Sequence, residues 1–261
     1  MAKILAIVNQ KGGVGKTTTA INLASYLAKN GKFTLLVDMD PQANASSGIG
    51  VFHEKTRQSK FSIYDAIINA TPIHLIKRET KQVGLHVVPG GQDLAGAAVE
   101  LVSVPRREWQ LHRVLLPIRH DYDYIIIDCP PSLGLLTINS LTAADEVLIP
   151  VQCEYYALEG LRQLISTIGL VQKHLKPSLR IAGALLTMHD NRNVLSKAVV
   201  QEVRDNFPHH VYQVVVPRNT RLAEAPSHGE SILSYDPGSV GAKAYQKLAE
   251  EIISKEINFS V

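Results

Sequence analysis

The feature that most constrains this chain is a glycine-rich segment near its start, residues 9–18, with the sequence NQKGGVGKTT. An apolar, β-branched run at residues 4–8 precedes it and is typical of a buried parallel strand. Apolar residues then recur at helical spacing over residues 19–28. A glycine loop between a strand and a helix is the context of a phosphate-binding loop, because backbone N–H groups and the helix N-terminus attract an anion. The segment therefore predicts a nucleotide site.

The side chains of this loop have separate expected roles. Lys16 is expected to contact the β- and γ-phosphates of ATP, and the Thr17 hydroxyl to contact Mg²⁺. The other residues expected around the phosphates are Lys11, Gly12, Gly13, Val14, Gly15 and Thr18. The loop departs from the common G-x-x-x-x-G-K-[ST] pattern, because Gln10 stands where the first glycine belongs and a second lysine, Lys11, follows it.

Composition narrows the class of protein. With 261 residues and 45% hydrophobic content, the chain is expected to form one large α/β domain over residues 1–261. No apolar run reaches the 18 residues that a membrane-spanning helix needs. Two cysteines, Cys129 and Cys153, are too few for a disulfide framework or a four-cysteine metal site, which indicates a reducing, cytoplasmic location. A net charge of +3 is too small to indicate nucleic-acid binding by itself.

Strand-like and helix-like segments alternate along the chain. Expected strands cover residues 4–8, 33–37, 85–88, 124–128, 146–151, 181–188 and 211–216. Expected helices cover 19–28, 62–70, 72–79, 93–102, 106–120, 157–174, 194–206 and 240–255, with Ser62 and Thr71 as N-caps, and a polar loop covers 41–60. This rhythm predicts a doubly wound, mostly parallel sheet with helices on both faces.

Aspartates follow two of the expected strands. Ligands bind beyond the carboxyl ends of the strands in such sheets, so an aspartate at a strand end is suited to hold Mg²⁺. Asp128 is the candidate for this role, and its alternative is an N-cap of the next helix. One of Asp38 and Asp40 is expected to contact Mg²⁺ and the other to polarise the attacking water. The alternative interpretation is that these residues only form an Asp-Pro turn.

These motifs together resemble the ParA/Soj family of chromosome- and plasmid-partitioning ATPases. Residues 11–18 are similar to the deviant Walker A loop of that family, residues 38–42 to its second motif and residues 126–132 to its Walker B motif. Residues 151–160 and 216–229 resemble later family blocks. The resemblance is weakest over 51–83 and the last dozen residues. It implies a P-loop NTPase fold, and the early glycine loop leads us to expect no N-terminal helix-turn-helix extension.

The resemblance also implies residue roles in a face-to-face, ATP-dependent homodimer. Lys11 would reach the phosphates of the partner, although a surface lysine is the alternative on spacing alone. Lys16 and Asp40 would complete the catalytic set, with Asp40 at the attacking water, which leaves Asp38 as a candidate ligand of Mg²⁺. Pro217 and Asn219 would flank the adenine, and Glu154 would contact the opposite nucleotide. The activity implied is slow, Mg²⁺-dependent hydrolysis of ATP.

A DNA surface is the next implication of the resemblance. Arg192 and Arg221 match arginines that the family uses to hold double-stranded DNA without regard to sequence, and Lys197, Arg204 and Arg218 are candidates to extend the patch. A ParB-like centromere-binding partner would stimulate hydrolysis and so release the ATPase from the nucleoid. Binding through phosphates would depend steeply on salt.

Three alternatives stay open at this point. A MinD-like ATPase binds the membrane through a basic amphipathic C-terminal helix. In this chain residues 249–261 carry three glutamates and one lysine, so no stable membrane association is expected. An iron–sulfur protein of the same superfamily would use Cys129, which reads more simply as a small apolar residue. A regulator of a replication initiator or of transcription would use the ATP cycle to set its oligomeric state.

Overall fold

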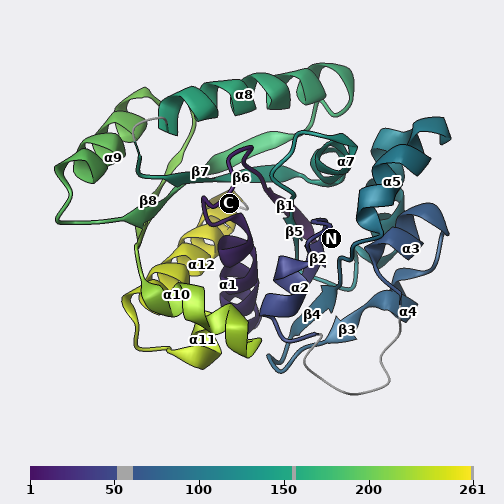
Figure 1. Cartoon of the computed structure of the whole chain (residues 1–261), viewed down its shortest axis with the longest axis horizontal. Coiled ribbons are helices and arrows are strands. Elements are labelled where there is room, and N and C mark those ends of the chain that lie inside the picture. Colours follow the sequence, from purple (N-terminus) through teal and green to yellow (C-terminus); the bar gives the residue numbers. More distant parts are fainter. Residues whose placement is uncertain (52–60, 155–156, 260–261) are drawn as a thin grey trace.

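The computed structural model describes residues 1–51, 61–154 and 157–259, and within them one sheet of eight strands organises the chain. The strands are β1 (Lys3–Ile7), β2 (Thr34–Asp38), β3 (Arg78–Glu79), β4 (Leu85–Val88), β5 (Tyr124–Asp128), β6 (Glu146–Gln152), β7 (Arg180–His189) and β8 (Val211–Pro217). Their order is β3-β4-β2-β5-β1-β6-β7-β8, and all neighbours are parallel except β3, which runs antiparallel to β4. The predicted doubly wound, mostly parallel sheet is confirmed (Figure 1).

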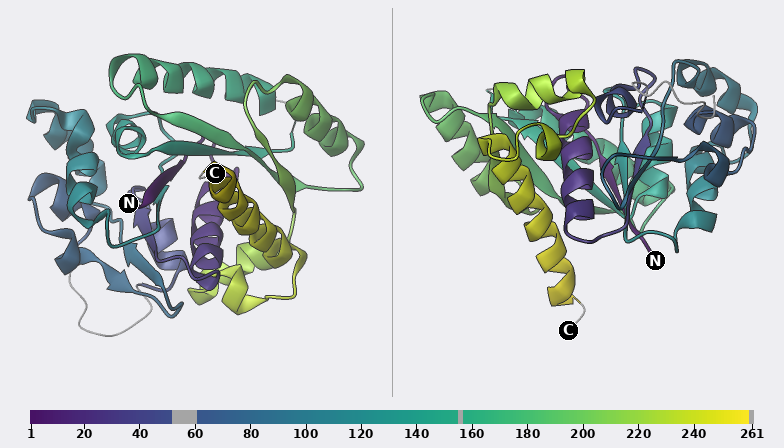
Figure 2. Two further views of the ribbon diagram at one scale, coloured as in Figure 1. Left: turned by 180° about the vertical axis from the view of Figure 1, so that it is seen from behind. Right: turned by 90° about the horizontal axis from the view of Figure 1, so that it is seen from below.

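Helices cover both faces of this sheet. They are α1 (Lys16–Lys29), α2 (Asn44–Gly48), α3 (Ile63–Ile68), α4 (Ile73–Ile76), α5 (Leu94–Glu100), α6 (Gln110–Leu115), α7 (Leu135–Ala143), α8 (Ala157–His174), α9 (Val194–Asn206), α10 (Thr220–Glu224), α11 (Ile232–Tyr235) and α12 (Val240–Phe259). Helices α3 to α9 pack on one face, and α1, α2 and α10 to α12 pack on the other, where α1 and α12 lie side by side (Figures 1 and 2).

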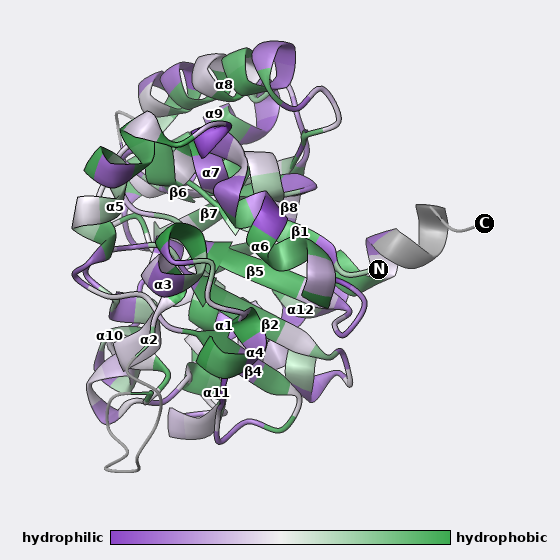
Figure 3. Cartoon of the chain, turned by 90° about the vertical axis from the view of Figure 1, so that its right-hand side faces the viewer, coloured by the Kyte–Doolittle hydropathy of each residue, from purple (hydrophilic) through white to green (hydrophobic). Residues whose placement is uncertain are grey.

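The two hydrophobic cores follow from the alternation of side chains along each strand. In β1, Ile4 and Ala6 join the core under α3 to α9, whereas Leu5 and Ile7 join the core under α1 and α12. Both faces of the strand are therefore apolar, as expected for a parallel strand covered on two sides. Figure 3 shows the hydrophobic colouring gathered on the central strands. Among the described residues, no helix combines the length and hydropathy needed to cross a bilayer.

The register of the central strands sets the position of the acidic groups. Asp38, the last residue of β2, is the register partner of Asp128, the last residue of β5. Asp128 in turn pairs with Ile7, directly before the glycine loop. Three strand ends that are far apart in the sequence therefore meet at one edge of the sheet.

The structure corrects the predicted helix at 72–79. Helix α4 covers only Ile73–Ile76, and Arg78–Glu79 forms strand β3. Thr71 is not the N-cap, because that position belongs to Pro72, which makes no side-chain capping bond. The N-cap at Ser62 is confirmed, since its hydroxyl accepts a hydrogen bond from the Tyr64 N–H in a capping box. Pairing with the edge of β4 is a tertiary interaction, so the local helical pattern did not reveal β3.

The other differences have local causes. The helix predicted at 106–120 is reduced to α6 and flanking 3₁₀ turns, with Arg106 in the left-handed region (φ 53°) and a proline inside the last turn. The loop predicted at 41–60 contains α2 in its described part, and residues 52–60 lie outside the described residues. Helix α7, which follows a Pro-Pro-Ser segment, had not been predicted.

Candidate nucleotide-binding site

The glycine loop forms an open concave turn between β1 and α1. Gly13 and Gly15 have positive φ angles of 74° and 89°, and Gly15 is the N-cap of α1. A Cβ atom at Gly12 or Gly13 would meet nothing within 4 Å, so the inner side of the loop has room for a phosphate. Lys16, the first residue of α1, is buried and donates from Nζ to the Lys11 carbonyl oxygen at 3.0 Å. Backbone N–H groups, the helix N-terminus and Lys16 thus form one small anion-binding site.

Two residues that sequence reasoning had missed hold this loop in place. Asn9 donates from Nδ2 to the Pro150 carbonyl oxygen at 2.7 Å and accepts from the Lys11 N–H at 3.0 Å. Thr187, on β7, donates from its hydroxyl to the Val14 carbonyl oxygen at 2.9 Å. Asn9 is the first residue of the glycine-rich segment, so its position in the sequence was a signal of its role. Thr187 offered none, because its contact depends on the neighbouring strands.

The Asp128 carboxylate lies fully buried beneath the loop, and neither of its oxygens has a hydrogen-bond partner among the described residues. Burial raises its pKa well above the ordinary range, and Asp38 adds to the rise, while the Thr17 hydroxyl, which lies close by but outside hydrogen-bond geometry, and Lys16 oppose it. Burial likewise lowers the pKa of Lys16, and Asp128 opposes that shift. Buried carboxylates persist when a cation compensates them, and oxygen ligands suit Mg²⁺. Asp128 and Thr17 therefore fit the predicted metal site.

Asp38 is engaged differently from Asp128. Its Oδ2 accepts from the Ser46 N–H at 2.8 Å and the Ser46 hydroxyl at 2.6 Å, and its Oδ1 accepts from the Asp40 N–H at 3.1 Å. Burial raises its pKa to about 6 against the lowering effect of the Ser46 bonds. These contacts give Asp38 an anchoring role for the segment that carries Asp40. A metal-binding role for Asp38 stays a prediction.

Asp40 follows this anchor and is near enough to Lys16 and Asp128 for its charge to raise the pKa of both. Its side chain is mostly buried, and Oδ1 accepts from the Gln42 N–H at 3.0 Å. Gly90, after β4, closes the same corner, since its N–H donates to the Ser46 hydroxyl. A Cβ at Gly90 would come within 2.9 Å of the Asp38 and Asp40 carbonyl oxygens, so this close approach requires glycine. Ser46 and Gly90, neither of them predicted, thus fix the position of Asp40.

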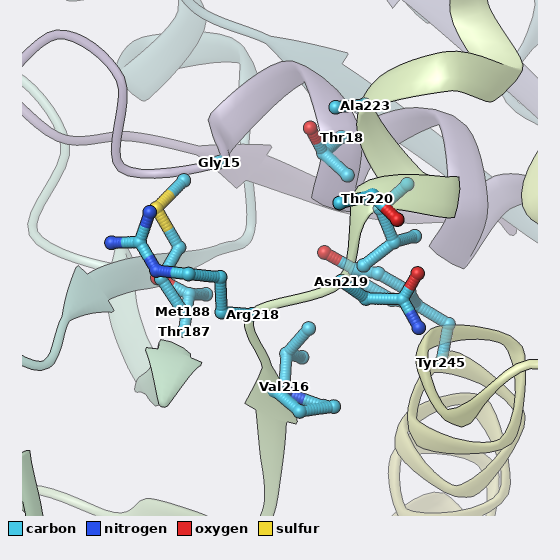
Figure 4. A pocket seen from close by; sticks show the side chains of 12 residues that line it. Gly15, Thr18, Thr187, Met188, Val216, Arg218, Asn219, Thr220, Ala223 and Tyr245 are labelled. Atoms are coloured by element: carbon cyan, nitrogen blue, oxygen red, sulfur yellow. The ribbon is translucent and has the colours of Figure 1, made fainter. Parts of the chain in front are cut away.

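A pocket of about 290 Å³ opens beside the loop, between the ends of β7 and β8 (Figure 4). Its lining includes Pro217 and Asn219, which sequence analysis had assigned to the adenine. Asn219 also caps α10, because its Oδ1 accepts from the Arg221 N–H at 2.8 Å. Met188 and Tyr245, which had not been predicted, line the pocket as well, and Met188 has a positive φ of 53°. The structure thus joins a base-sized pocket to the phosphate loop.

The second lysine of the loop is paired with a carboxylate of its own chain. Lys11 Nζ lies 2.8 Å from Glu154 Oε2, and both side chains are about half exposed. Gln152 donates to the other Glu154 oxygen. The structure therefore brings Lys11 and Glu154 together within one chain. Their predicted contacts with the nucleotide of a partner subunit stay predictions.

The two arginines predicted to bind DNA follow neighbouring strands. Arg192 comes directly after β7, and Arg221 lies in α10 after β8. The ends of these strands meet, since His189 pairs with Pro217 and the Arg218 N–H donates to the His189 carbonyl oxygen at 2.9 Å. Both arginine side chains are exposed, by 90% and 53%. Lys197 and Arg204 lie on the exposed side of α9, and Arg204 Nη2 donates to the Gln213 carbonyl oxygen near the start of β8, away from the strand ends that meet.

Comparison with known proteins decides the family. A family model described as an AAA domain matches residues 2–181. The sporulation initiation inhibitor protein Soj of Bacillus subtilis (strain 168) is 55% identical over 252 residues, which cover 97% of this chain and 98% of that protein. The chromosome partitioning protein ParA of Myxococcus xanthus (strain DK1622) is 53% identical over 256 residues, covering 98% of this chain and 89% of that protein. This chain belongs to the ParA/Soj family of chromosome-partitioning ATPases.

A solved structure supports the nucleotide assignment for this ParA/Soj-family chain. It is described as a cobyrinic acid a,c-diamide synthase from Mycobacterium smegmatis with bound ATP analog and magnesium. The two chains share 35% sequence identity and a TM-score of 0.83, with 97% of this chain and 95% of that chain covered. The predictions of a P-loop fold, of ATPase activity, and of ATP and Mg²⁺ are confirmed by these likenesses.

Proposed function

We propose that residues 1–261 act as one ATPase domain whose ATP-bound form is a face-to-face homodimer held on double-stranded DNA. Slow hydrolysis, stimulated by a ParB-like partner, then returns the chain to a form with low DNA affinity. The observation that carries the ATP switch is the buried Asp128 carboxylate, unpartnered among the described residues and placed beneath an open glycine loop beside Lys16.

The chain's own residues divide the work at the phosphates. Gly12, Gly13 and the N-terminus of α1 present N–H groups, and Lys16 neutralises charge on the terminal phosphates. Mg²⁺, ligated by Thr17 and Asp128, would neutralise further charge when bound. Asp40 orients the attacking water, and this role is supported by its fixed position next to Lys16 and Asp128. Catalysis in this proposal is positioning and charge neutralisation.

Lys11 is proposed to act across the dimer interface. Its ammonium group is about half exposed at the mouth of the glycine loop, and its partner Glu154 is equally exposed. Exposed ion pairs contribute little to stability. A phosphate of the partner subunit can therefore displace Glu154, whose carboxylate would then face the opposite nucleotide region. This exchange would tie dimer formation to the terminal phosphate.

The DNA surface is proposed from Arg192 and Arg221, and Lys197, Arg204 and Arg218 are candidates to extend it. Its support is the exposure of Arg192 and Arg221 beyond the adjoining ends of β7 and β8. Two copies in a dimer would double the number of phosphate contacts, which raises affinity and steepens its dependence on salt. In the cell, the ATP-bound form would be associated with the nucleoid. A replication initiator is a further candidate partner.

Co-sedimentation with duplex DNA tests this proposal. The chain is incubated with ATP, with ADP and without nucleotide at two salt concentrations, and retention is expected only with ATP and mainly at low salt. The double variant Arg192→Ala and Arg221→Ala is expected to lose retention but to bind ATP normally. Arg113→Ala with Arg162→Ala, which removes the same charge from exposed positions on α6 and α8, is the matched control. Equal retention of the two double variants would contradict the DNA surface.

A further inference from the structure

Arg192 is already bound by a carboxylate of its own chain. Its Nε and Nη2 atoms lie 3.2 Å from Asp190 Oδ1 and 3.2 Å from Asp190 Oδ2, so the guanidinium and the carboxylate form a two-pronged contact. The Arg192 N–H also donates to Asp190 Oδ1 at 2.9 Å, which fixes the carboxylate in the loop after β7. Two parallel N–H···O bonds are also how arginine grips a phosphate. Asp190 therefore occupies the edge of Arg192 that a DNA phosphate would use.

Arg221 is also paired within the chain, through single contacts with two carboxylates. Its Nη1 donates to Glu224 Oε2 at 2.9 Å, and its Nε lies 3.5 Å from Asp236 Oδ2. The Tyr235 hydroxyl donates to the same Glu224 oxygen at 3.1 Å and so holds the carboxylate beside the guanidinium. Both arginines assigned to DNA are thus neutralised locally in the DNA-free chain.

We propose that Asp190 and Glu224 compete with DNA phosphates for Arg192 and Arg221, and so keep the DNA affinity of a single chain low. This inference rests on the proposed DNA-binding function. A neutralised arginine attracts DNA less strongly and contributes less to the release of counterions. Stable binding to DNA then requires the larger number of phosphate contacts that two chains make together. DNA binding would therefore depend on formation of the ATP-dependent dimer.

The exposure of these ion pairs indicates that the carboxylates compete with DNA phosphates and do not merely orient the arginines. Both contacts are open to water, with 90% of the Arg192 side chain and 53% of the Arg221 side chain exposed. Such pairs are weak, so a phosphate can replace the carboxylate. The hydrogen bonds from Arg192 and Arg221 lower the pKa of Asp190 and of Glu224, respectively, so both carboxylates are charged at neutral pH.

The size of the effect follows from the weakness of an exposed pair. Freeing one arginine is expected to tighten DNA binding by about two- to fivefold. Freeing both in one chain multiplies these factors to roughly four- to twenty-five-fold, provided that the two sites act independently. The slope of log affinity against log salt should steepen by about one for each arginine freed.

The test compares the full chain with the variant Asp190→Asn plus Glu224→Gln, in which Asp236 stays 3.5 Å from Arg221 Nε, so that the factors above are upper limits for Arg221. Binding to a fluorescent duplex of arbitrary sequence is measured by anisotropy, with ATP and with ADP, over a series of salt concentrations. The variant is expected to bind more tightly by the factor above, to show a steeper salt slope, and to stay on DNA at low salt even with ADP.

Asp205→Asn plus Glu250→Gln is the matched control. These exposed carboxylates accept hydrogen bonds from Gln201 and Gln246, so this variant changes the net charge equally without freeing an arginine. Should the test variant bind DNA no more tightly than this control, or more weakly than wild type, the competition model is overturned. If wild-type chain with ATP is not retained on DNA at any salt concentration, the proposed function and this inference both fail. If the wild-type chain is retained on DNA with ATP, but the test variant and the control variant bind DNA with equal affinity, this inference fails while the proposed function stands.

Discussion

Replacing Asp128 by asparagine should stabilise the chain in the absence of Mg²⁺ and nucleotide while removing its response to them. The carboxylate is fully buried, its pKa is raised by burial and by Asp38, and its oxygens have no partner among the described residues. Asparagine keeps the shape of the side chain but removes the charge. The apo protein then loses an unfavourable buried ion, and the holo protein loses a ligand of the metal.

The magnitude follows from the extra cost of the charge, because asparagine still leaves a buried polar group at this position. An unsatisfied buried group costs about 1–3 kcal/mol and more when it is charged, so removing the charge should recover a similar amount. We expect Asp128→Asn to raise the free energy of unfolding of the apo protein by about 2 kcal/mol. For a chain of this size, about 2 kcal/mol corresponds to a rise of roughly 4–8 °C in Tm.

The assay is thermal unfolding in EDTA, followed by the same scan with Mg²⁺ and a slowly hydrolysed ATP analogue. At a ligand concentration of about 100 times Kd, wild type should gain about 2.7 kcal/mol of stability, and the variant should gain almost none. Asp145→Asn is the matched control, because Asp145 Oδ2 accepts from the Ile4 N–H and pairs with Arg119. The same substitution there should lower Tm.

Two results would refute this reasoning. A lower Tm for the Asp128→Asn protein in EDTA would show that the carboxylate is compensated in the apo state. An undiminished shift on addition of Mg²⁺ and the ATP analogue would show that Asp128 does not contribute to the metal site. Either result would remove the observation on which the proposed ATP switch depends.

Three further predictions concern the same edge of the sheet. Asp40→Ala should retain ATP binding and dimer formation but slow phosphate release by about 100-fold or more, and unchanged release would contradict its role at the water. Lys11→Ala should abolish the ATP-dependent increase in mass seen by analytical ultracentrifugation and should lower turnover by about 1000-fold or more, and an unchanged increase in mass with ATP would contradict its role across the interface. The third prediction concerns Asp38 in EDTA, where burial holds its pKa at about 6 in the folded chain, against 3.8 in the unfolded chain. Because the folded chain binds this proton more tightly, the contribution of Asp38 to stability is complete below pH ~4 and is lost as the pH rises to 6. The free energy of unfolding should fall by about 3 kcal/mol over this pH range, as measured by denaturant unfolding at a series of pH values. An equal fall in the Asp38→Asn variant, which has no group to titrate there, would contradict this assignment.

The sequence by itself determined the elements whose signals are local. The glycine loop, the strands that end at Asp38 and Asp128, and the helix that begins after the loop are contiguous segments with their own hydrophobic periods and turn residues. The N-cap at Ser62 belongs to the same class, because its partners Tyr64 and Asp65 are two and three residues away. The nucleotide site was predictable to this extent because a parallel sheet gathers strand ends at one edge.

Only the tertiary structure decided which side chains meet there. Ser46 binds Asp38, Thr187 binds the loop at Val14, and β3 exists only as a partner of β4, and none of these contacts has a local pattern. The state of Asp128 was equally hidden, because a carboxylate's burial and lack of partners depend on every element packed around it. Hydrophobic periodicity reports which face of a segment is covered. It does not report the distant segment that covers it, and the chemistry of this site depends on that pairing.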